Sequence, residues 1–129
     1  FMLQKEVVER MAAPPGSKVY GRLSVMLQAY CAVTPLFTVP PGAFRPAPKV
    51  DSAVVRLVPR AADAIGIDDR DRFAAIVRAA FGQRRKTLRN ALAGSVDAAA
   101  IAAAGLDPGA RAERLSVADF VRLSNLAPA

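Results

Sequence analysis

Residues 83–90 hold the densest group of side chains that could bind an anion. Four cations fall within six positions, between neutral Gln, Thr and Asn side chains. They are Arg84, Arg85, Lys86 and Arg89. Arginine and lysine neutralise phosphates and release counterions, and neutral polar groups can add hydrogen bonds to a nucleic-acid backbone. No acidic residue occurs between positions 72 and 96. The segment is therefore a candidate nucleic-acid contact, and the alternative is a solvated helix face.

Residues 40–52 form a second candidate site around one aromatic side chain. Four prolines in nine positions fix φ and remove backbone donors, so this segment is neither regular helix nor central strand. The stiff loop displays Phe44 between two cations, Arg45 and Lys49. Such a loop suits a planar, anionic ligand such as a nucleotide. The alternative is that Phe44 packs into the core beneath the loop.

A third polar cluster, residues 17–24, lies where a loop enters a predicted helix. It contains Lys18 and Arg22 among three hydroxyl-bearing residues. Two interpretations are open: an anion site at a helix N-terminus, or a capping loop with a basic flank.

The composition excludes several classes of chemistry. The 129 residues carry a net charge of +7, which favours a polyanion partner without choosing between RNA, DNA and an anionic membrane. With no histidine and one cysteine, the chain cannot form an internal disulfide, a Ser/His/Asp or Cys/His catalytic site, or a usual zinc site. We expect a reducing compartment, no metal and no membrane-spanning segment. None of the eight glycines forms G-x-G, so no Gly-rich phosphate loop is present.

The first half of the chain predicts mixed α/β structure. Periodicity and composition predict a buried strand end at 1–4, helices at 5–13 and 21–31, and strands at 33–39 and 52–58. The two longer strands are expected to pair antiparallel, with the first at a sheet edge because it contains Pro35. The chain begins with Phe inside an apolar run, which indicates a fragment cut within a strand.

The second half predicts a small all-α unit. Helices are expected at 68–82, near 88–92, at 98–104 and from 116 onward. Asp97 and the Ser116–Asp119 pair are predicted N-caps, and Gly82 is predicted to end its helix in left-handed geometry. The expected organisation is an α/β part at 1–60, a linker at 61–66 and a helical domain at 67–129.

Several of these stretches together resemble the ribosomal RNA adenine N6,N6-dimethyltransferase family, in its small-subunit (16S rRNA, KsgA-type) branch. The matching stretches are Phe-Met-Leu-Gln-Lys-Glu-Val from Phe1, Tyr-Gly-Arg-Leu-Ser-Val from Tyr20, the proline loop with its flanks from Val39, and residues 81–90, 105–108 and 111–116. The likeness follows the family's order over nearly the whole chain but covers only the family's C-terminal half.

The resemblance implies a fold, a reaction and a partner. The fold would be the last strands and helices of a Rossmann-like S-adenosylmethionine methyltransferase sheet, followed by a small all-α RNA-binding domain. The reaction would move methyl groups from S-adenosylmethionine to N6 of two adjacent adenines near the 3′ end of small-subunit rRNA, in the cytoplasm, during ribosome biogenesis. The partner would be the immature 30S subunit. The cofactor segments of the family are missing here, so the chain alone would be inactive.

The resemblance also implies residue roles. Phe44 matches the loop aromatic that stacks on the target adenine, and the basic cluster at 84–86 matches the family's rRNA contact. The full set of expected RNA-binding residues is Arg84, Arg85, Lys86, Arg89, Arg22, Arg45 and Lys49. The alternatives are a non-catalytic RNA-binding or ribosome-assembly module, and a large-subunit rRNA adenine methylase of the antibiotic-resistance type.

Overall fold

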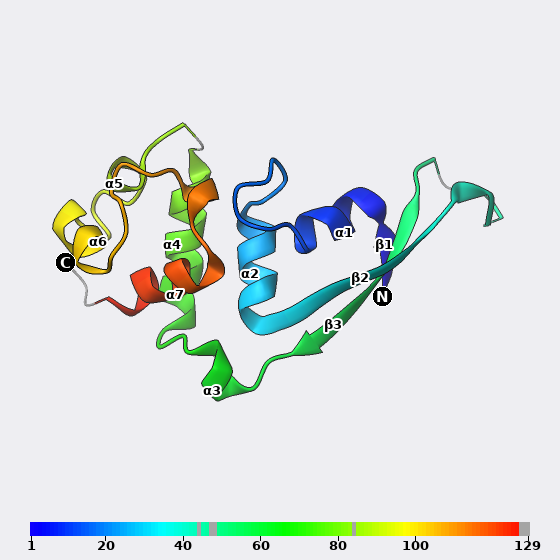
Figure 1. The fold of residues 1–129 in the computed structure, drawn as a ribbon, viewed down its shortest axis with the longest axis horizontal. Coiled ribbons are helices and arrows are strands. Elements are labelled where there is room, and N and C mark those ends of the chain that lie inside the picture. Colours follow the sequence, from blue (N-terminus) through cyan, green and yellow to red (C-terminus); the bar gives the residue numbers. More distant parts are fainter. Residues whose placement is uncertain (44, 47–48, 84, 127–129) are drawn as a thin grey trace.

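The computed structural model describes residues 1–43, 45–46, 49–83 and 85–126. Figure 1 shows a long β-hairpin at one end of the molecule and a group of short helices at the other. The helix α2 (Arg22–Tyr30) stands between the two ends.

The sheet has three antiparallel strands in the order β1-β3-β2. These strands are β1 (Met2–Gln4), β2 (Cys31–Val39) and β3 (Ser52–Pro59). The antiparallel pairing of the two longer strands is thus confirmed. Strand β2 lies at the edge, and its register shifts between Pro35 and Phe37, because proline cannot donate a ladder hydrogen bond.

One face of the sheet is covered by α1 (Lys5–Met11). The buried side chains of Val8 and Met11 pack there against Ala53 and Val55 of β3. Successive residues of a strand point to opposite faces, so Ala53 and Val55 present one apolar face to the helix.

The helical end contains five helices and a 3-10 turn within the described residues. They are α3 (Ala62–Ile65), α4 (Arg70–Gly82), α5 (Leu88–Ala91), α6 (Ala98–Ala103), the turn η2 (Ala112–Arg114) and α7 (Val117–Asn125). A further 3-10 turn, η1 (Pro41–Ala43), follows β2.

The predicted N-caps at Asp97 and Ser116 are confirmed. The Asp97 carboxylate accepts a hydrogen bond from the Ala100 N–H at 2.7 Å. At α7, the Asp119 N–H donates to Ser116 Oγ at 3.1 Å and the Ser116 N–H donates to the Asp119 carboxylate at 3.0 Å. These bonds satisfy backbone donors that a helix start otherwise leaves without partners.

The main core joins α2 to the helical end of the chain. Val25 and Ala29 of α2 belong to the same buried cluster as Phe73 and Ile76 of α4 and Phe120 of α7. The division into domains at residues 61–66 stays a prediction, and α2 shares a core with helices beyond that linker.

Residues 61–66, which the sequence predicts as a linker, include the short helix α3, which ends at Gly66 with φ of 66°. Two local predictions are wrong. The end strand β1 is exposed rather than buried, with Met2 51% accessible, because no described residue covers its outer side. Gly82 lies within α4 and lacks a positive φ, because the helix ends one residue later in extended Gln83.

Two other glycines have positive φ. Gly105, directly after the C-cap of α6, has φ of 82°, and Gly94, in the turn that follows α5, has φ of 87°, values that L-residues with a side chain rarely adopt. No helix in the described part of the chain has the length and apolar character needed to cross a membrane.

Candidate nucleic-acid interface

The basic segment at 83–90 is held rigidly at its base and open at its tip. Helix α4 ends at Gly82, and the Lys86 N–H closes a turn by donating to the Gln83 carbonyl at 3.0 Å. Leu88, fully buried, anchors α5 in the core. The cations Arg85, Lys86 and Arg89 are all exposed, while Arg84 lies outside the described residues.

A second basic segment lies alongside the first. Thr87 and Arg111 form an isolated antiparallel bridge, the Leu88 N–H donates to the Ala110 carbonyl at 2.8 Å, and the Arg89 N–H donates to the Pro108 carbonyl at 3.0 Å. These bonds bring the exposed side chain of Arg111 beside the 83–90 segment. Arg111 directly precedes the 3-10 turn η2, and Arg114, which is also exposed, is the last residue of that turn.

The loop before α2 is hydrogen-bonded to η2 and to the residue that follows it. The Gly16 N–H donates to the Glu113 carbonyl of η2 at 2.8 Å. The Tyr20 hydroxyl, buried in the core, donates to the Leu115 carbonyl at 2.7 Å. Lys18 and Arg22 are exposed on this loop and on the first turn of α2. The turn η2 therefore connects the predicted contact Arg22 to the 83–90 segment.

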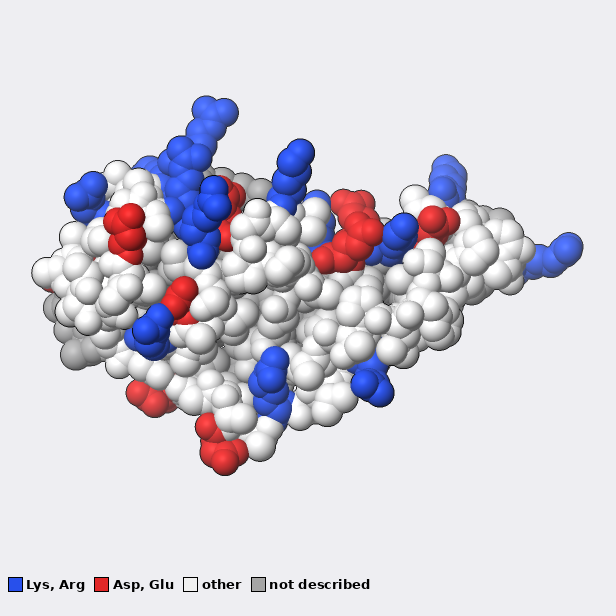
Figure 2. Space-filling view, viewed as in Figure 1, with Lys and Arg blue, Asp and Glu red and all other residues white. Residues whose placement is uncertain are grey.

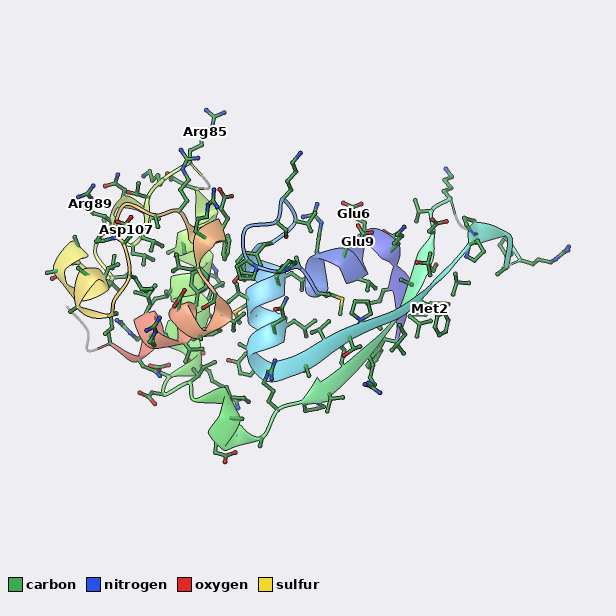
Figure 3. All side chains as sticks on the ribbon, in the orientation of Figure 1. Met2, Glu6, Glu9, Arg85, Arg89 and Asp107 are labelled. Atoms are coloured by element: carbon green, nitrogen blue, oxygen red, sulfur yellow. The ribbon has the colours of Figure 1, made fainter. Side chains whose placement is uncertain are left out.

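We call these three segments together the basic surface: Lys18, Arg22, Arg85, Lys86, Arg89, Arg111 and Arg114. Figure 2 shows Lys and Arg side chains projecting along one edge of the molecule at its helical end. Figure 3 labels Arg85 and Arg89 on this edge. The hydrogen bonds described above connect the three segments, and their exposed cations complement the negative charge of a nucleic-acid backbone.

Arg111 and Arg114 were not among the candidate binding residues of the sequence, and Lys18 was named there only as part of the polar cluster at 17–24. The half of the chain beyond residue 60 contains ten cations and eight acids, so its small net charge hides a local cluster. Arg111 stands more than twenty positions after the basic segment, and the Thr87–Arg111 bridge and the neighbouring backbone hydrogen bonds bring the two segments together.

The polar cluster at 17–24 is partly structural. The buried Ser24 hydroxyl donates to the Arg10 carbonyl and accepts from the Gly21 N–H at 3.2 Å. These bonds fix the start of α2 against the end of α1, which supports the capping interpretation for Ser24. The cations Lys18 and Arg22 project from this capped helix start.

The proline loop lies far from the basic surface. It connects β2 to β3 at the tip of the hairpin, at the opposite end of the molecule from α5 and α6 (Figure 1). Arg45 and Lys49 are exposed there, while Phe44 lies outside the described residues. The structure thus separates Arg45 and Lys49 from the other predicted contacts.

Acidic side chains occupy the stretch between the two basic regions. Figure 2 shows acidic side chains in this stretch, and Figure 3 labels Glu6 and Glu9 of α1 there. Glu6 accepts a hydrogen bond from Arg10 at 3.1 Å. The cations predicted as RNA contacts are therefore divided between a hairpin tip and a helical end.

Two ionisable groups next to the basic surface have shifted pKa values. Burial raises the pKa of the Tyr20 hydroxyl well above its usual range, and the charge of Asp119 adds to the effect. Burial also disfavours the charged form of Asp119, but hydrogen bonds from Ser116 and Arg122 outweigh it and lower the pKa of this carboxyl. Asp119 therefore caps α7 in its ionised form at neutral pH.

The described residues offer no group of three or more His, Cys, Asp or Glu side chains that could hold a metal ion. What they offer is a set of cations on a rigid support, which can bind phosphates but supplies neither a nucleophile nor a general base.

Comparison with known proteins gives a consistent result. The family model for ribosomal RNA adenine dimethylase matches residues 1–128. The ribosomal RNA small subunit methyltransferase A of Xanthomonas campestris pv. campestris (strain B100) is 74% identical over 126 residues, which are 98% of this chain and 48% of the relative. The protein of the same name from Xanthomonas oryzae pv. oryzae (strain PXO99A) is 72% identical over the whole chain and 49% of the relative. The chain thus spans about half the length of these curated relatives.

Two solved structures share the fold. A dimethyladenosine transferase from Plasmodium falciparum superposes with a TM-score of 0.76 and 26% identity, covering 95% of this chain and 54% of that one. The 23S rRNA methyltransferase ErmE superposes with a TM-score of 0.65 and 23% identity, covering 95% and 51%. The mixed helix and strand architecture is therefore that of Rossmann-like rRNA methyltransferases.

Proposed function

The chain belongs to the ribosomal RNA adenine dimethylase family, and from this premise we propose that it supplies the RNA-binding part of an S-adenosylmethionine-dependent rRNA methyltransferase. The intact enzyme would transfer methyl groups to N6 of two adjacent adenines near the 3′ end of 16S rRNA. Its partner would be the immature 30S subunit in the cytoplasm. The observation that carries the proposal is the basic surface, where three segments far apart in sequence meet.

The helical end of the chain, α4 to α7, would be the all-α RNA-binding domain of this enzyme. Its cations are carried by short turns whose backbone is held by hydrogen bonds and by buried neighbours such as Leu88, so the backbone needs little ordering when the cations meet phosphates. Phosphate contacts fix register and orientation, whereas the base to be modified must be selected elsewhere. In this division of roles, the basic surface orients the rRNA and the proline loop receives the target adenine.

The chain's own residues do not fit a cofactor site. Its sequence has no G-x-G segment to bring backbone N–H groups against a cofactor. We therefore assign S-adenosylmethionine binding and the methyl-transfer step to the part of the relatives' length that lies outside the match with residues 1–129. Isothermal titration of the chain with S-adenosylmethionine should give no binding, and tight binding would contradict this assignment.

RNA binding by the chain itself is the central test. Fluorescence anisotropy with an RNA hairpin from the 3′ end of small-subunit rRNA should give an affinity that falls steeply as salt increases. Each phosphate contact contributes about 0.7–0.9 to the slope of log K against log salt. Replacing Arg85, Lys86 and Arg89 by alanine should lower that slope by about 2 to 3.

A second triple variant serves as a control, because it changes the net charge of the chain by the same amount. Arg56 of β3, Arg60 and Arg122 of α7 lie on other elements, and their replacement by alanine should leave the slope nearly unchanged. Equal slopes for the two triple variants would show that binding is non-specific and would contradict a defined interface. If the chain shows no salt-dependent RNA binding, a structural role that does not involve RNA is favoured instead.

A further inference from the structure

A pocket opens between α5 and α6, beside Arg89 of the basic surface. Its volume is about 390 Å³, and ligand pockets commonly have about 300–1,000 Å³. Figure 1 shows the two helices next to each other at the helical end, and Figure 3 labels Arg89 there. The described residues that line the pocket are Arg89, Ala93, Gly94, Val96, Asp97 and Ala98. We call it the α5–α6 pocket.

The walls of this pocket are fixed by backbone hydrogen bonds and buried neighbours. The carbonyl of Leu92, which is fully buried, accepts from the Ser95 N–H at 2.9 Å and from the Val96 N–H at 3.0 Å. Ile101 anchors α6 in the same core cluster as Leu92. Because both sides are held in this way, the pocket needs little rearrangement to receive a ligand.

The charges at the pocket favour a neutral ligand over a phosphate. Arg89 supplies one cation and Asp97 one carboxylate, while the other lining residues are small or apolar. The Asp97 carboxylate accepts from the Ala100 N–H at 2.7 Å, and its second oxygen can accept from a ligand. A phosphate would meet this carboxylate, whereas a nucleobase has both N–H donors for Asp97 and acceptors for Arg89.

The helical end has its aromatic rings in the core. Residues 61–129 contain three aromatic side chains, Phe73, Phe81 and Phe120. Phe73 and Phe120 are fully buried, and Phe81 packs against the rings of Tyr20 and Phe120. Proteins often recognise unpaired RNA bases by stacking them on such rings. Since these rings are occupied in the core, the α5–α6 pocket is the feature of this surface that can cover a base.

We propose that the α5–α6 pocket binds one unpaired base of the rRNA, while the phosphate of the same nucleotide lies on the basic surface. This base is distinct from the target adenine assigned to the proline loop. Bases in a duplex are paired and stacked, so they cannot enter the pocket. The inference rests on the proposed function and deepens it, because the pocket lets the basic surface distinguish an RNA loop or bulge from a duplex.

Fluorescence anisotropy with two RNAs tests the pocket. One is the hairpin from the 3′ end of small-subunit rRNA, and the other is a blunt duplex with the same stem and no unpaired base. Ala93→Leu places a larger side chain in the pocket, at an exposed position. It should weaken hairpin binding at least about fivefold, as loss of one base contact does, and leave duplex binding unchanged. The salt slope should be retained for both RNAs, because the cations are intact.

A second variant and a control accompany this measurement. Ala98→Leu fills the same pocket from α6 and should give the same result, since leucine is a good helix former. Ala99→Leu makes the same change at the next residue of α6, which is exposed and is not among the lining residues named above, and it should bind both RNAs like the wild type. Circular dichroism checks that all three variants are folded.

Abasic RNA gives a readout that leaves the protein unchanged. Replacing the loop bases of the hairpin by abasic nucleotides should weaken binding to the wild type at least about fivefold and should remove its advantage over Ala93→Leu. Equal affinity of the wild type for the intact and abasic hairpins would overturn the proposal. Equal losses for hairpin and duplex in both pocket variants would also overturn it.

The outcomes separate this inference from the proposed function. If the chain binds RNA with the expected salt slope but filling the pocket has no effect on the hairpin, the proposed function stands and the base site fails. If the chain binds neither RNA, both fail.

Discussion

At the scale of single residues, uncharged side chains position the cations of the proposed RNA site. Tyr20 is the clearest example, because it carries no charge yet holds the loop of Lys18 against η2. Its ring contacts Phe81 edge-on, with centroids 6.0 Å apart, and its hydroxyl reaches the Leu115 carbonyl. The positions of charged residues are thus set by an uncharged one.

Removing the Tyr20 hydroxyl should reduce both stability and RNA binding. Tyr20→Phe keeps the ring but leaves the Leu115 carbonyl without this buried donor, at a cost of about 1 to 3 kcal/mol in the free energy of unfolding. Because Lys18 and η2 lose a connection, RNA affinity should also fall. Chemical denaturation and anisotropy measure the two effects, and unchanged values for both would contradict the role of Tyr20.

The same residue predicts a response to alkaline pH. The pKa of Tyr20 is raised in the folded chain, so the neutral hydroxyl is favoured by folding. Its contribution to stability is complete below the unfolded value of about 10 and is lost as pH rises above it. The free energy of unfolding should fall above pH 10, and the fall should be shallower in Tyr20→Phe. Equal slopes in the two proteins would refute the assignment.

Phe44 is the residue on which the methylation proposal depends. Stacking of a base on an aromatic ring is worth about 1–3 kcal/mol. In a full-length enzyme that contains this sequence, Phe44→Ala should lower methylation by about tens of fold while the melting temperature is retained. Leu36→Ala on β2 is a suitable control, because Leu36 is an exposed apolar residue of the same hairpin. Full activity in Phe44→Ala would rule out the stacking role.

At the scale of elements, short helices need their caps. Helix α7 has nine residues and supplies Phe120 and Leu123 to the core, so its start must be fixed. An isolated helix of this length is marginal in water, and the Ser116–Asp119 box stabilises its first turn.

Loss of this capping box should be visible in a pH titration. Ser116→Ala should lower the free energy of unfolding by about 1 kcal/mol at neutral pH. The lowered pKa of Asp119 means that its contribution is present above about pH 4 and is lost as pH falls through the folded value. Wild type and Asp119→Asn should therefore converge in stability at acid pH. A constant difference between them across this range would contradict the cap's ionised state.

At the scale of the whole molecule, the sequence predicts elements better than it predicts their neighbours. The helices, the antiparallel hairpin, the edge position of Pro35 and the caps at Asp97 and Ser116 follow from local patterns, and the structure confirms them. The prediction that β1 is buried was wrong, because the apolar residues of a strand do not indicate which segment covers them.

The composition of the basic surface was only partly predictable. Arg85, Lys86 and Arg89 stand together in the sequence, so their charge density is visible without a structure. Arg111 joins them through a backbone bridge to Thr87, and backbone pairing between distant segments leaves no signature in charge or periodicity. Sequence alone also cannot reveal that α2 shares a core with α4 and α7.

The bond from Tyr20 to Leu115 spans 95 positions of the chain, and this separation has a kinetic consequence. Closing so long a loop costs entropy before any contact compensates for it, so such contacts form late in folding. The complete anion-binding surface should therefore appear only with the final cooperative step. In refolding experiments, recovery of RNA binding should coincide with burial of Tyr20 rather than with the earlier gain of helix.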